Sequence, residues 1–148
     1  MRKAFTMIEL VFVIVILGIL AIVAIPKLAA TRSDAEVAKV AQNIMTGASE
    51  IASYAMANAQ TEENLTVMSN SMMSLEASGN AVLSANKAEI SIGGVSDCLT
   101  LEIETNATND NLIISFGDAG SDSLCRSLQS AIDATKYPMK LRGASVVY

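Results

Sequence analysis

Hydrophobic positions along the chain follow three successive patterns. Residues 10–25 form an unbroken apolar run, LVFVIVILGILAIVAI. With residues 5–9 added, the run has about 21 residues, or roughly 30 Å of helix, which matches one bilayer crossing. From residue 27 to 59, apolar side chains recur at the spacing of an amphipathic helix. From residue 88 the period changes to two, which is typical of strands.

The amphipathic stretch is predicted to continue the apolar helix, giving one helix from Phe5 to about Ala59 that is roughly 80 Å long. Its apolar face is expected to comprise Val37, Val40, Ala41, Ile44, Met45, Ala48, Ile51, Ala52, Ala55 and Met56. Ser33 and Glu36 have the spacing of a capping box, so a break near Thr31 followed by a restart is a second interpretation. The first half is expected to anchor and assemble, and the second half to pack on a domain.

The rest of the chain is predicted to be a small head that mixes helices and strands. One helical face comprises Leu65, Met68, Met72 and Leu75. The spacing beside leucines indicates core methionines rather than a copper site, and Gly79 with Asn80 would end this helix. Strands are predicted over 88–92, 98–105, 112–116 and, at the edge, 141–148. Turns are expected at Gly93-Gly94 and 106–111, and a short helix over 123–132. The predicted fold is α+β, a long helix packed against a small antiparallel sheet.

Charges around the apolar run indicate its orientation in the membrane and help to decide whether it is a cleaved signal peptide, a plain membrane anchor or a specialised segment. Arg2 and Lys3 should stay cytoplasmic, which sends everything after Lys27 to the other side of the membrane. No clean Ala-x-Ala site occurs over residues 21–30, so the run differs from a cleaved secretory peptide. A plain anchor has no use for Glu9, because a carboxylate deep in the bilayer costs up to about 3 kcal/mol. Glu9 either has a function or extends its side chain to the interface.

A specific motif accounts for these features. Ala4, the sequence FTMIEL from Phe5 to Leu10 and the apolar run resemble the processing and methylation motif of type IV pilins and type II secretion pseudopilins. The resemblance covers roughly the first 30 residues. It implies that an aspartyl prepilin peptidase cuts between Ala4 and Phe5 on the cytoplasmic side, and that Phe5 is then N-methylated. Gly18 and Pro26 stand where the family's helix has its glycine and proline, which weaken helical hydrogen bonding. Ala4 departs from the family's usual glycine.

The resemblance also implies how the chain assembles. Glu9 is expected to pair with the Phe5 amine of a neighbouring subunit and so to set the register, because a misplaced subunit would leave both charges unpaired in hydrocarbon. The implied partners are pilin or pseudopilin subunits, prepilin peptidase and the inner-membrane assembly platform. The expected parts are a leader (1–4), a transmembrane assembly helix (5–26), an amphipathic helix half (27–59) and a periplasmic head (60–148).

The implied function is that of a filament subunit. Two kinds of filament remain open. A type II secretion pseudopilus is favoured because the head is small and lacks a long adhesive insertion, and a surface or DNA-uptake type IV pilus is the alternative. The chain would be a single-pass inner-membrane protein before assembly.

Composition argues against other classes of protein. The net charge is −5 and no run of Lys or Arg exceeds two, which disfavours a nucleic-acid surface beyond a small patch of Lys136, Lys140 and Arg142. The chain has no histidine, no nucleophile motif and no phosphate-binding glycine loop, so an enzyme is not expected.

Two cysteines lie in the C-terminal half. In an exported domain Cys98 and Cys125 are expected to form a disulfide that closes a loop of about 28 residues, and two buried free thiols are the alternative. Metal or catalytic roles are disfavoured because no histidine is present to pair with them. By resemblance to pilins, residues 103–123 inside this loop would be an exposed, variable surface.

Two further sites are hypotheses. Asp118 and Asp122 lie in GDAGSDS, which resembles in chemistry the calcium loops of major pseudopilins, although its spacing matches no defined motif and a solvated turn competes with this interpretation. Calcium is the only cofactor considered. Asn64 in EENLT and Asn106 in ETNAT are N-glycosylation sequons with an acid two residues earlier, which is the extended bacterial form, and both are expected in polar loops or at helix edges.

Overall fold

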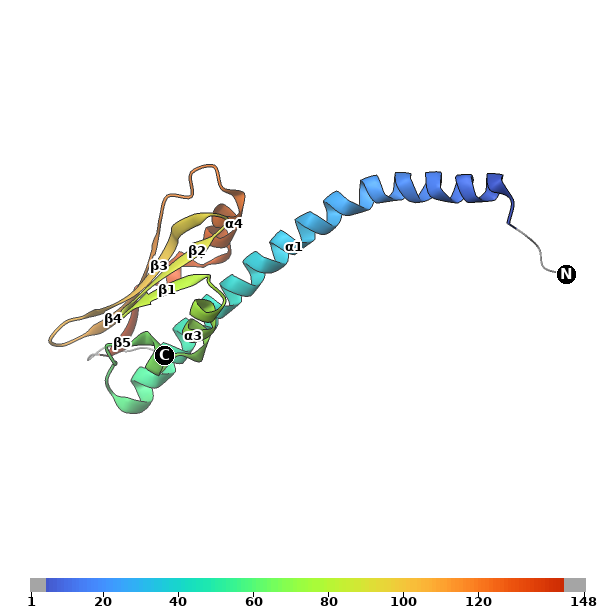
Figure 1. Ribbon diagram of the computed structural model, residues 1–148. Coiled ribbons are helices and arrows are strands. Elements are labelled where there is room, and N and C mark those ends of the chain that lie inside the picture. Colours follow the sequence, from blue (N-terminus) through green and yellow to red (C-terminus); the bar gives the residue numbers. More distant parts are fainter. Residues whose placement is uncertain (1–4, 143–148) are drawn as a thin grey trace. The chain divides into compact units, whose positions relative to one another are not determined.

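The computed structural model describes residues 5–142 of the chain. These residues belong to two compact units, Met1–Ala35 and Glu36–Tyr148. The first unit contains the N-terminal part of helix α1, which runs from Met7 to Asn58 over 52 residues (Figure 1). The second unit contains the rest of α1 and the whole head.

Helix α1 is continuous, so the prediction of one long helix is confirmed and the predicted break near Thr31 is wrong. Thr31 lies inside the helix, and its hydroxyl donates a hydrogen bond to the Leu28 carbonyl at 3.0 Å. This bond within a turn is compatible with helical backbone, and no glycine or proline occurs between Lys27 and Glu36 to interrupt it.

The head begins with two short helices, α2 (Leu65–Met68) and α3 (Asn70–Ala77). One continuous helix is predicted here, and that prediction is wrong because Ser69 is extended, with φ −146° and ψ 120°. The Ser69 hydroxyl accepts a hydrogen bond from the Met72 amide at 3.1 Å and donates one to the Glu50 carboxylate at 2.6 Å. Glu50 lies on α1, so a tertiary contact fixes the cap that separates the two helices.

The sheet has five antiparallel strands in the order of the sequence. They are β1 (Ala81–Ser84), β2 (Lys87–Ile92), β3 (Val95–Thr105), β4 (Asp110–Phe116) and β5 (Met139–Arg142). The strands predicted at 88–92, 98–105 and 112–116 are confirmed. The predicted edge strand exists over Met139–Arg142, and residues 143–148 lie outside the described range. Strand β1 is an element that the sequence pattern does not predict.

Tight turns connect the first four strands. Gly93 and Gly94 join β2 to β3 with φ of 64° and 92°, so glycine is required there, as predicted. The predicted turn between β3 and β4 is closed by a hydrogen bond from the Asn106 amide to the Asn109 carbonyl at 2.8 Å. The long connection from β4 to β5 contains helix α4 (Ser123–Ala131), as predicted, and a 3-10 turn at Ala134–Lys136.

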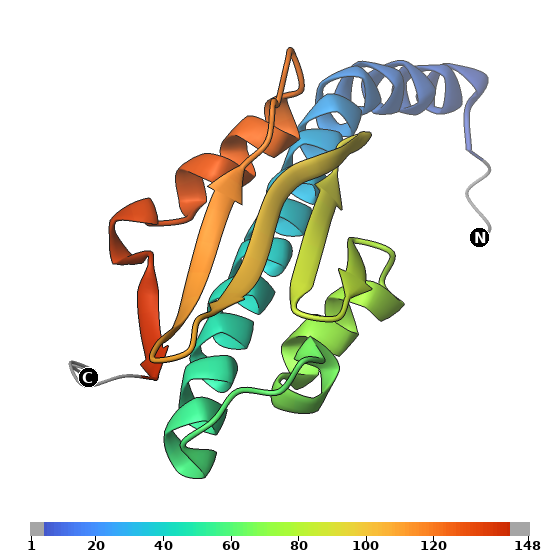
Figure 2. The same ribbon diagram turned by 90° about the vertical axis from the view of Figure 1, so that its left-hand side faces the viewer.

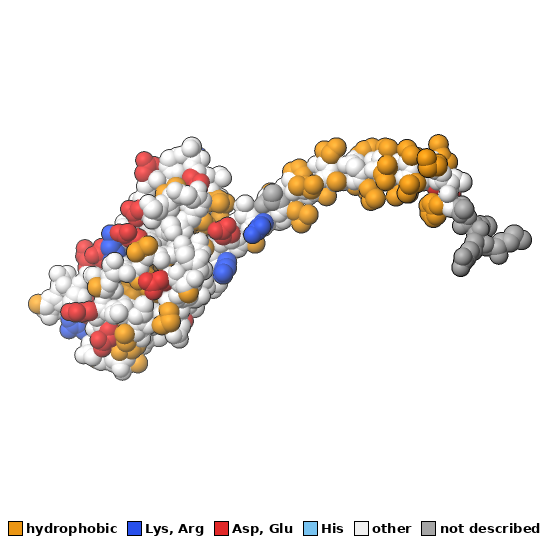
Figure 3. Space-filling view, viewed as in Figure 1, with side chains coloured by type: hydrophobic (Ala, Val, Ile, Leu, Met, Phe, Trp, Pro, Cys, Tyr) orange, Lys and Arg blue, Asp and Glu red, His pale blue; other side chains and the backbone are white. Residues whose placement is uncertain are grey.

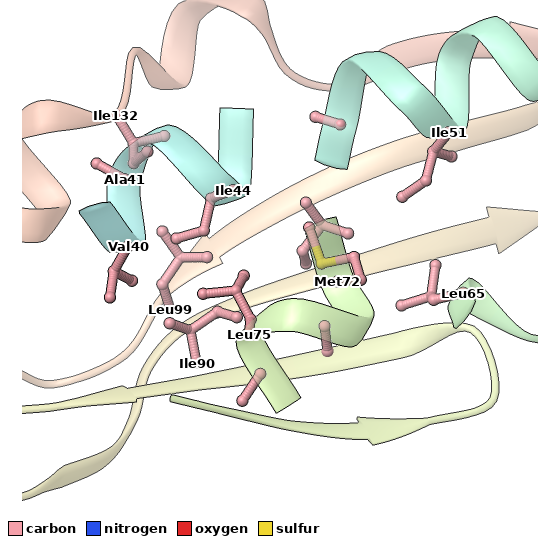
Figure 4. Close-up of a cluster of buried hydrophobic side chains, with 14 of the residues drawn as sticks. Val40, Ala41, Ile44, Ile51, Leu65, Met72, Leu75, Ile90, Leu99 and Ile132 are labelled. Carbon is pink, nitrogen blue, oxygen red and sulfur yellow. The ribbon is translucent and has the colours of Figure 1, made fainter. Parts of the chain in front are cut away.

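The core of the head lies between the sheet and helices α1, α2, α3 and α4, each of which contributes buried side chains. Figure 2 shows the sheet lying across the C-terminal part of α1, with α3 and α4 on either side. In Figure 4, Ile44 and Ile51 of α1 face the same buried cluster as Met72, Leu75 and Leu99. The predicted strand face of Leu99, Leu101 and Ile103 is confirmed, since each is at most 1% exposed. The α+β prediction, a long helix packed against an antiparallel sheet, is therefore confirmed.

The apolar face of α1 is narrower than predicted. Seven of its ten expected members are buried, namely Val37, Val40, Ala41, Ile44, Ala48, Ile51 and Ala55. Met45 and Met56 are 42% and 45% exposed, which contradicts the prediction for them. Each directly follows a buried residue, so its side chain is rotated about 100° away from the core.

Candidate functional site

The most unusual surface of the chain is the apolar helix surface, defined as the large hydrophobic side chains between Phe5 and Leu28. Their exposed fractions range from 42% for Ile16 to 81% for Met7. On the face drawn in Figure 3, hydrophobic side chains gather along this part of α1, whereas acidic side chains are scattered over the head. A monomer in water does not leave so many adjacent hydrophobic residues uncovered, so this surface requires lipid or protein around it.

Length and composition identify what can cover it. Within residues 5–142, α1 is the one helix long and apolar enough to cross a bilayer. No acidic or basic residue occurs between Glu9 and Lys27. A single helix that satisfies its own backbone hydrogen bonds can lie in hydrocarbon with such a surface exposed to lipid.

Glu9 lies at the start of this surface and takes part in a capping box with Thr6. The Glu9 Oε2 atom accepts hydrogen bonds from the Thr6 amide at 2.8 Å and from the Thr6 hydroxyl at 2.7 Å. The Thr6 hydroxyl in turn accepts one from the Glu9 amide at 3.3 Å. The Thr-x-x-Glu spacing that signals this box is present in the sequence, but the family resemblance points only to a role of Glu9 between subunits.

The other Glu9 oxygen remains available. Its Oε1 atom accepts no hydrogen bond from any residue in the described part of the chain. A carboxylate that is half satisfied by its own helix can still accept a donor from a second chain.

Gly18 and Pro26 both lie within α1. A Cβ atom added at Gly18 would meet nothing within 4 Å, so packing inside this chain does not require a glycine there. Pro26 has no amide hydrogen, and the Ile22 carbonyl therefore has no helical donor four residues later.

Comparison with known families identifies the segment that contains this site. Residues 1–25 match the prokaryotic N-terminal methylation motif, whereas no curated protein and no solved structure matches the chain significantly. This segment is a prepilin-type N-terminal methylation motif, which indicates a type IV pilin-like family. Proteins with this motif are structural subunits rather than enzymes, and they are processed by prepilin peptidase and assemble with their own kind. The motif and the apolar helix fit a single-pass inner-membrane prepilin.

The predicted cleavage point lies at the edge of the described structure. Ala4 is outside the described residues. Phe5 is 79% exposed, and both Phe5 and Thr6 precede the first helical residue, Met7. Cleavage before Phe5 and methylation of its amine remain predictions.

The predicted disulfide is confirmed. Cys98 of β3 and Cys125 of α4 are bonded, with their Cα atoms 5.6 Å apart, and both side chains are fully buried. Gln129 of α4 reinforces the same contact, because its Nε2 donates hydrogen bonds to the carbonyls of Cys98 at 2.8 Å and Gly117 at 2.9 Å. The disulfide therefore attaches α4 to the sheet from inside the core.

Of residues 103–123, which are predicted to form an exposed surface, 11 of 21 are exposed, and the prediction is wrong for Ile103, Asp110 and Leu112, which are buried. The segment contains β4, which lies between β3 and β5 in the sheet. Ile103 and Leu112 are at most 1% exposed because they belong to the core face. The exposed residues are 104–108 at the end of β3 and in the turn after it, 115 and 116 at the end of β4, and 118, 120, 121 and 123 in the connection to α4 and at its start.

Asp118 and Asp122, the candidate calcium ligands, both have local structural roles. Asp118 accepts a hydrogen bond from the Gly120 amide at 2.8 Å, and Asp122 caps α4 through the Cys125 amide at 2.8 Å. Within residues 5–142, no three Asp, Glu, Cys or His side chains gather closely enough to hold a metal ion. The geometry gives the calcium hypothesis no further support.

Of the candidate basic patch Lys136, Lys140 and Arg142, one member, Arg142, forms an ion pair inside the head. Arg142 of β5 donates to the Asp110 carboxylate from Nε at 2.8 Å and from Nη2 at 3.3 Å. The Asp110 side chain is 1% exposed and also accepts a hydrogen bond from Thr61 at 2.9 Å. Arg142 thus neutralises a buried acid, while Lys136 and Lys140 are exposed. No sequence pattern signals this buried cluster, because Thr61, Asp110 and Arg142 are distant in sequence.

The two sequon asparagines have different surroundings. Asn64 is exposed and caps α2, and Asn106 is exposed in the turn between β3 and β4.

Proposed function

We propose that this pilin-like protein is a structural subunit of a type II secretion pseudopilus. It is released from the inner membrane after cleavage before Phe5 and polymerises through the segment 5–26. In this proposal residues 27–59 carry the head, 60–148, on the filament. The observation that supports subunit assembly best is the apolar helix surface with one acid, Glu9, at its start.

Glu9 would support assembly by pairing with the positively charged Phe5 amine of an adjacent subunit. Cleavage before Phe5 creates a new amine at the helix start, and methylation leaves it able to carry a positive charge. The Oε1 atom of Glu9 has no partner within the described chain and can accept a hydrogen bond from the Phe5 amine of an adjacent subunit. In hydrocarbon an unpaired charge is costly, so one register is favoured over its neighbours.

Gly18 and Pro26 fit the same proposal. Each position weakens helical hydrogen bonding, and packing within the described chain does not require a glycine at position 18. Local weakening of α1 would let the helix adjust when it passes from lipid to contact with other subunits.

Two features of the head are the support for proposing a pseudopilus rather than an adhesive pilus. The disulfide lies inside the core, and the connection from β4 to α4 is short, covering residues 117–122. Within the described residues, most of the segment between the two cysteines belongs to β3, β4 and α4 rather than to a long irregular loop. A surface or DNA-uptake pilus is the alternative function.

The Glu9→Gln variant tests the assembly mechanism. Glutamine can keep the capping box with Thr6 but loses the negative charge, so we expect normal membrane insertion and loss of filaments. Insertion is measured by membrane fractionation and filaments by electron microscopy of cells that overproduce the protein. The matched control is Thr6→Ala, which removes the capping hydroxyl, keeps the charge and should still assemble. Normal filaments from Glu9→Gln would contradict the register mechanism.

The kind of filament is tested by deletion of the gene in the native host. Loss of enzyme secretion, with surface pili and DNA uptake unchanged, is expected for a pseudopilin. Normal secretion with loss of pili or of DNA uptake would support the alternative.

A further inference from the structure

Two sequons occur in the head, and the structure distinguishes them. An oligosaccharyltransferase holds its acceptor as an extended peptide and brings the asparagine amide nitrogen to an activated sugar. In a folded domain the acceptor must therefore be exposed along its length and must have an asparagine side chain that the fold does not use.

Asn64 does not meet this requirement. Its Oδ1 atom accepts hydrogen bonds from the Thr66 amide at 3.0 Å and the Thr66 hydroxyl at 2.8 Å, which caps α2. Leu65 between them is fully buried, and its amide donates to the Ala85 carbonyl at 3.1 Å. Extending this sequon would uncap α2 and pull Leu65 out of the core.

Asn106 meets both conditions. All five residues from Glu104 to Thr108 are exposed, so the acid, the asparagine and the threonine are accessible together. The Asn106 side chain makes no hydrogen bond to any residue within 5–142, whereas its backbone amide and carbonyl contact Asn109 at 2.8 Å and Arg142 at 3.5 Å. This segment forms the end of the β3–β4 hairpin, which projects from the sheet in Figure 1.

We propose that Asn106 is an N-glycosylation site and that Asn64 is not. The co-substrate is an oligosaccharide linked to a lipid pyrophosphate. The Asn106 Nδ2 forms a bond to the anomeric carbon of the sugar while the bond from that carbon to the pyrophosphate oxygen breaks. The electron pair leaves with the lipid pyrophosphate, one amide proton passes through the transferase to solvent, and no redox change occurs.

The test is mass spectrometry of the full-length protein purified from membranes of the native host. An intact mass above that of the methylated polypeptide is expected, and peptide mapping should place all of the added glycan mass on Asn106. The Asn106→Gln variant and the Glu104→Gln variant should lose the modification, and Asn64→Gln should retain it completely. A bare mass for the wild-type protein, or a glycan on Asn64, would overturn the proposal.

The outcome is independent of filament assembly. Glycosylation at Asn106 requires export of the head but not polymerisation, so the Glu9→Gln variant should be modified to the same extent as the wild-type protein. A failure of the assembly mechanism would leave the Asn106 result unchanged, and a bare Asn106 would leave the assembly mechanism unchanged.

Discussion

Reduction of the Cys98–Cys125 disulfide is expected to lower the free energy of unfolding of the head by about 3 to 4 kcal/mol. The two cysteines are 27 positions apart, and the chain-entropy estimate for a loop of that length gives this value. Replacing both cysteines by alanine should cost about 1 kcal/mol more, because both side chains are fully buried and their sulfur atoms leave unfilled space in the core. The native fold should survive, since Gln129 still attaches α4 to the sheet.

The assay is urea unfolding of the full-length protein in detergent micelles, followed by tyrosine fluorescence. Tyr54 and Tyr137 pack against the core of the head and report on its unfolding. Three samples are compared: oxidised wild type, reduced wild type and the Cys98→Ala/Cys125→Ala variant. The exposed Val82→Ala serves as a control that should unfold like the wild type. If reduction leaves the unfolding midpoint unchanged, the cross-link does not restrict the unfolded chain and the estimate is refuted.

Three more substitutions test the core and its polar contacts. Ile44→Ala should destabilise the head by about 2 to 5 kcal/mol in the same assay, whereas Met45→Ala, at an exposed neighbouring position, should cost much less. Hydrogen bonding by Arg142 holds the pKa of Asp110 below its ordinary value of 3.8. The ionised Asp110 carboxylate therefore stabilises the fold fully above pH 3.8, and this stabilisation is lost as the pH falls through the lowered pKa. Asp110→Asn should flatten this acid dependence, and an unchanged pH profile would contradict it. The Ser69 hydroxyl likewise lowers the pKa of Glu50, and Glu50→Gln should increase hydrogen exchange in α3 with α4 as the internal control.

Much of this protein follows from local sequence patterns. The apolar run, the helical spacing after Pro26 and the alternation around Leu99 to Ile103 depend on residues a few positions apart, and they predict the long helix and the central strands correctly. The Gly93-Gly94 turn is also local, because positive φ is a property of the residues themselves. The N-terminal methylation motif is a continuous segment, so the motif is recognisable from the order of its amino acids alone.

The tertiary structure decided the features that depend on distant partners. Ser69 ends one helix and begins another because Glu50 on α1 binds its hydroxyl, and β1 forms because β2 folds back beside it. The burial of Asp110 depends on Thr61 and Arg142, which no spacing rule connects. Asn64 and Asn106 have the same sequon, and only their surroundings separate them. Hydrophobic periodicity predicts which side chains are buried. Polar contacts between distant residues depend instead on which helices and strands pack together.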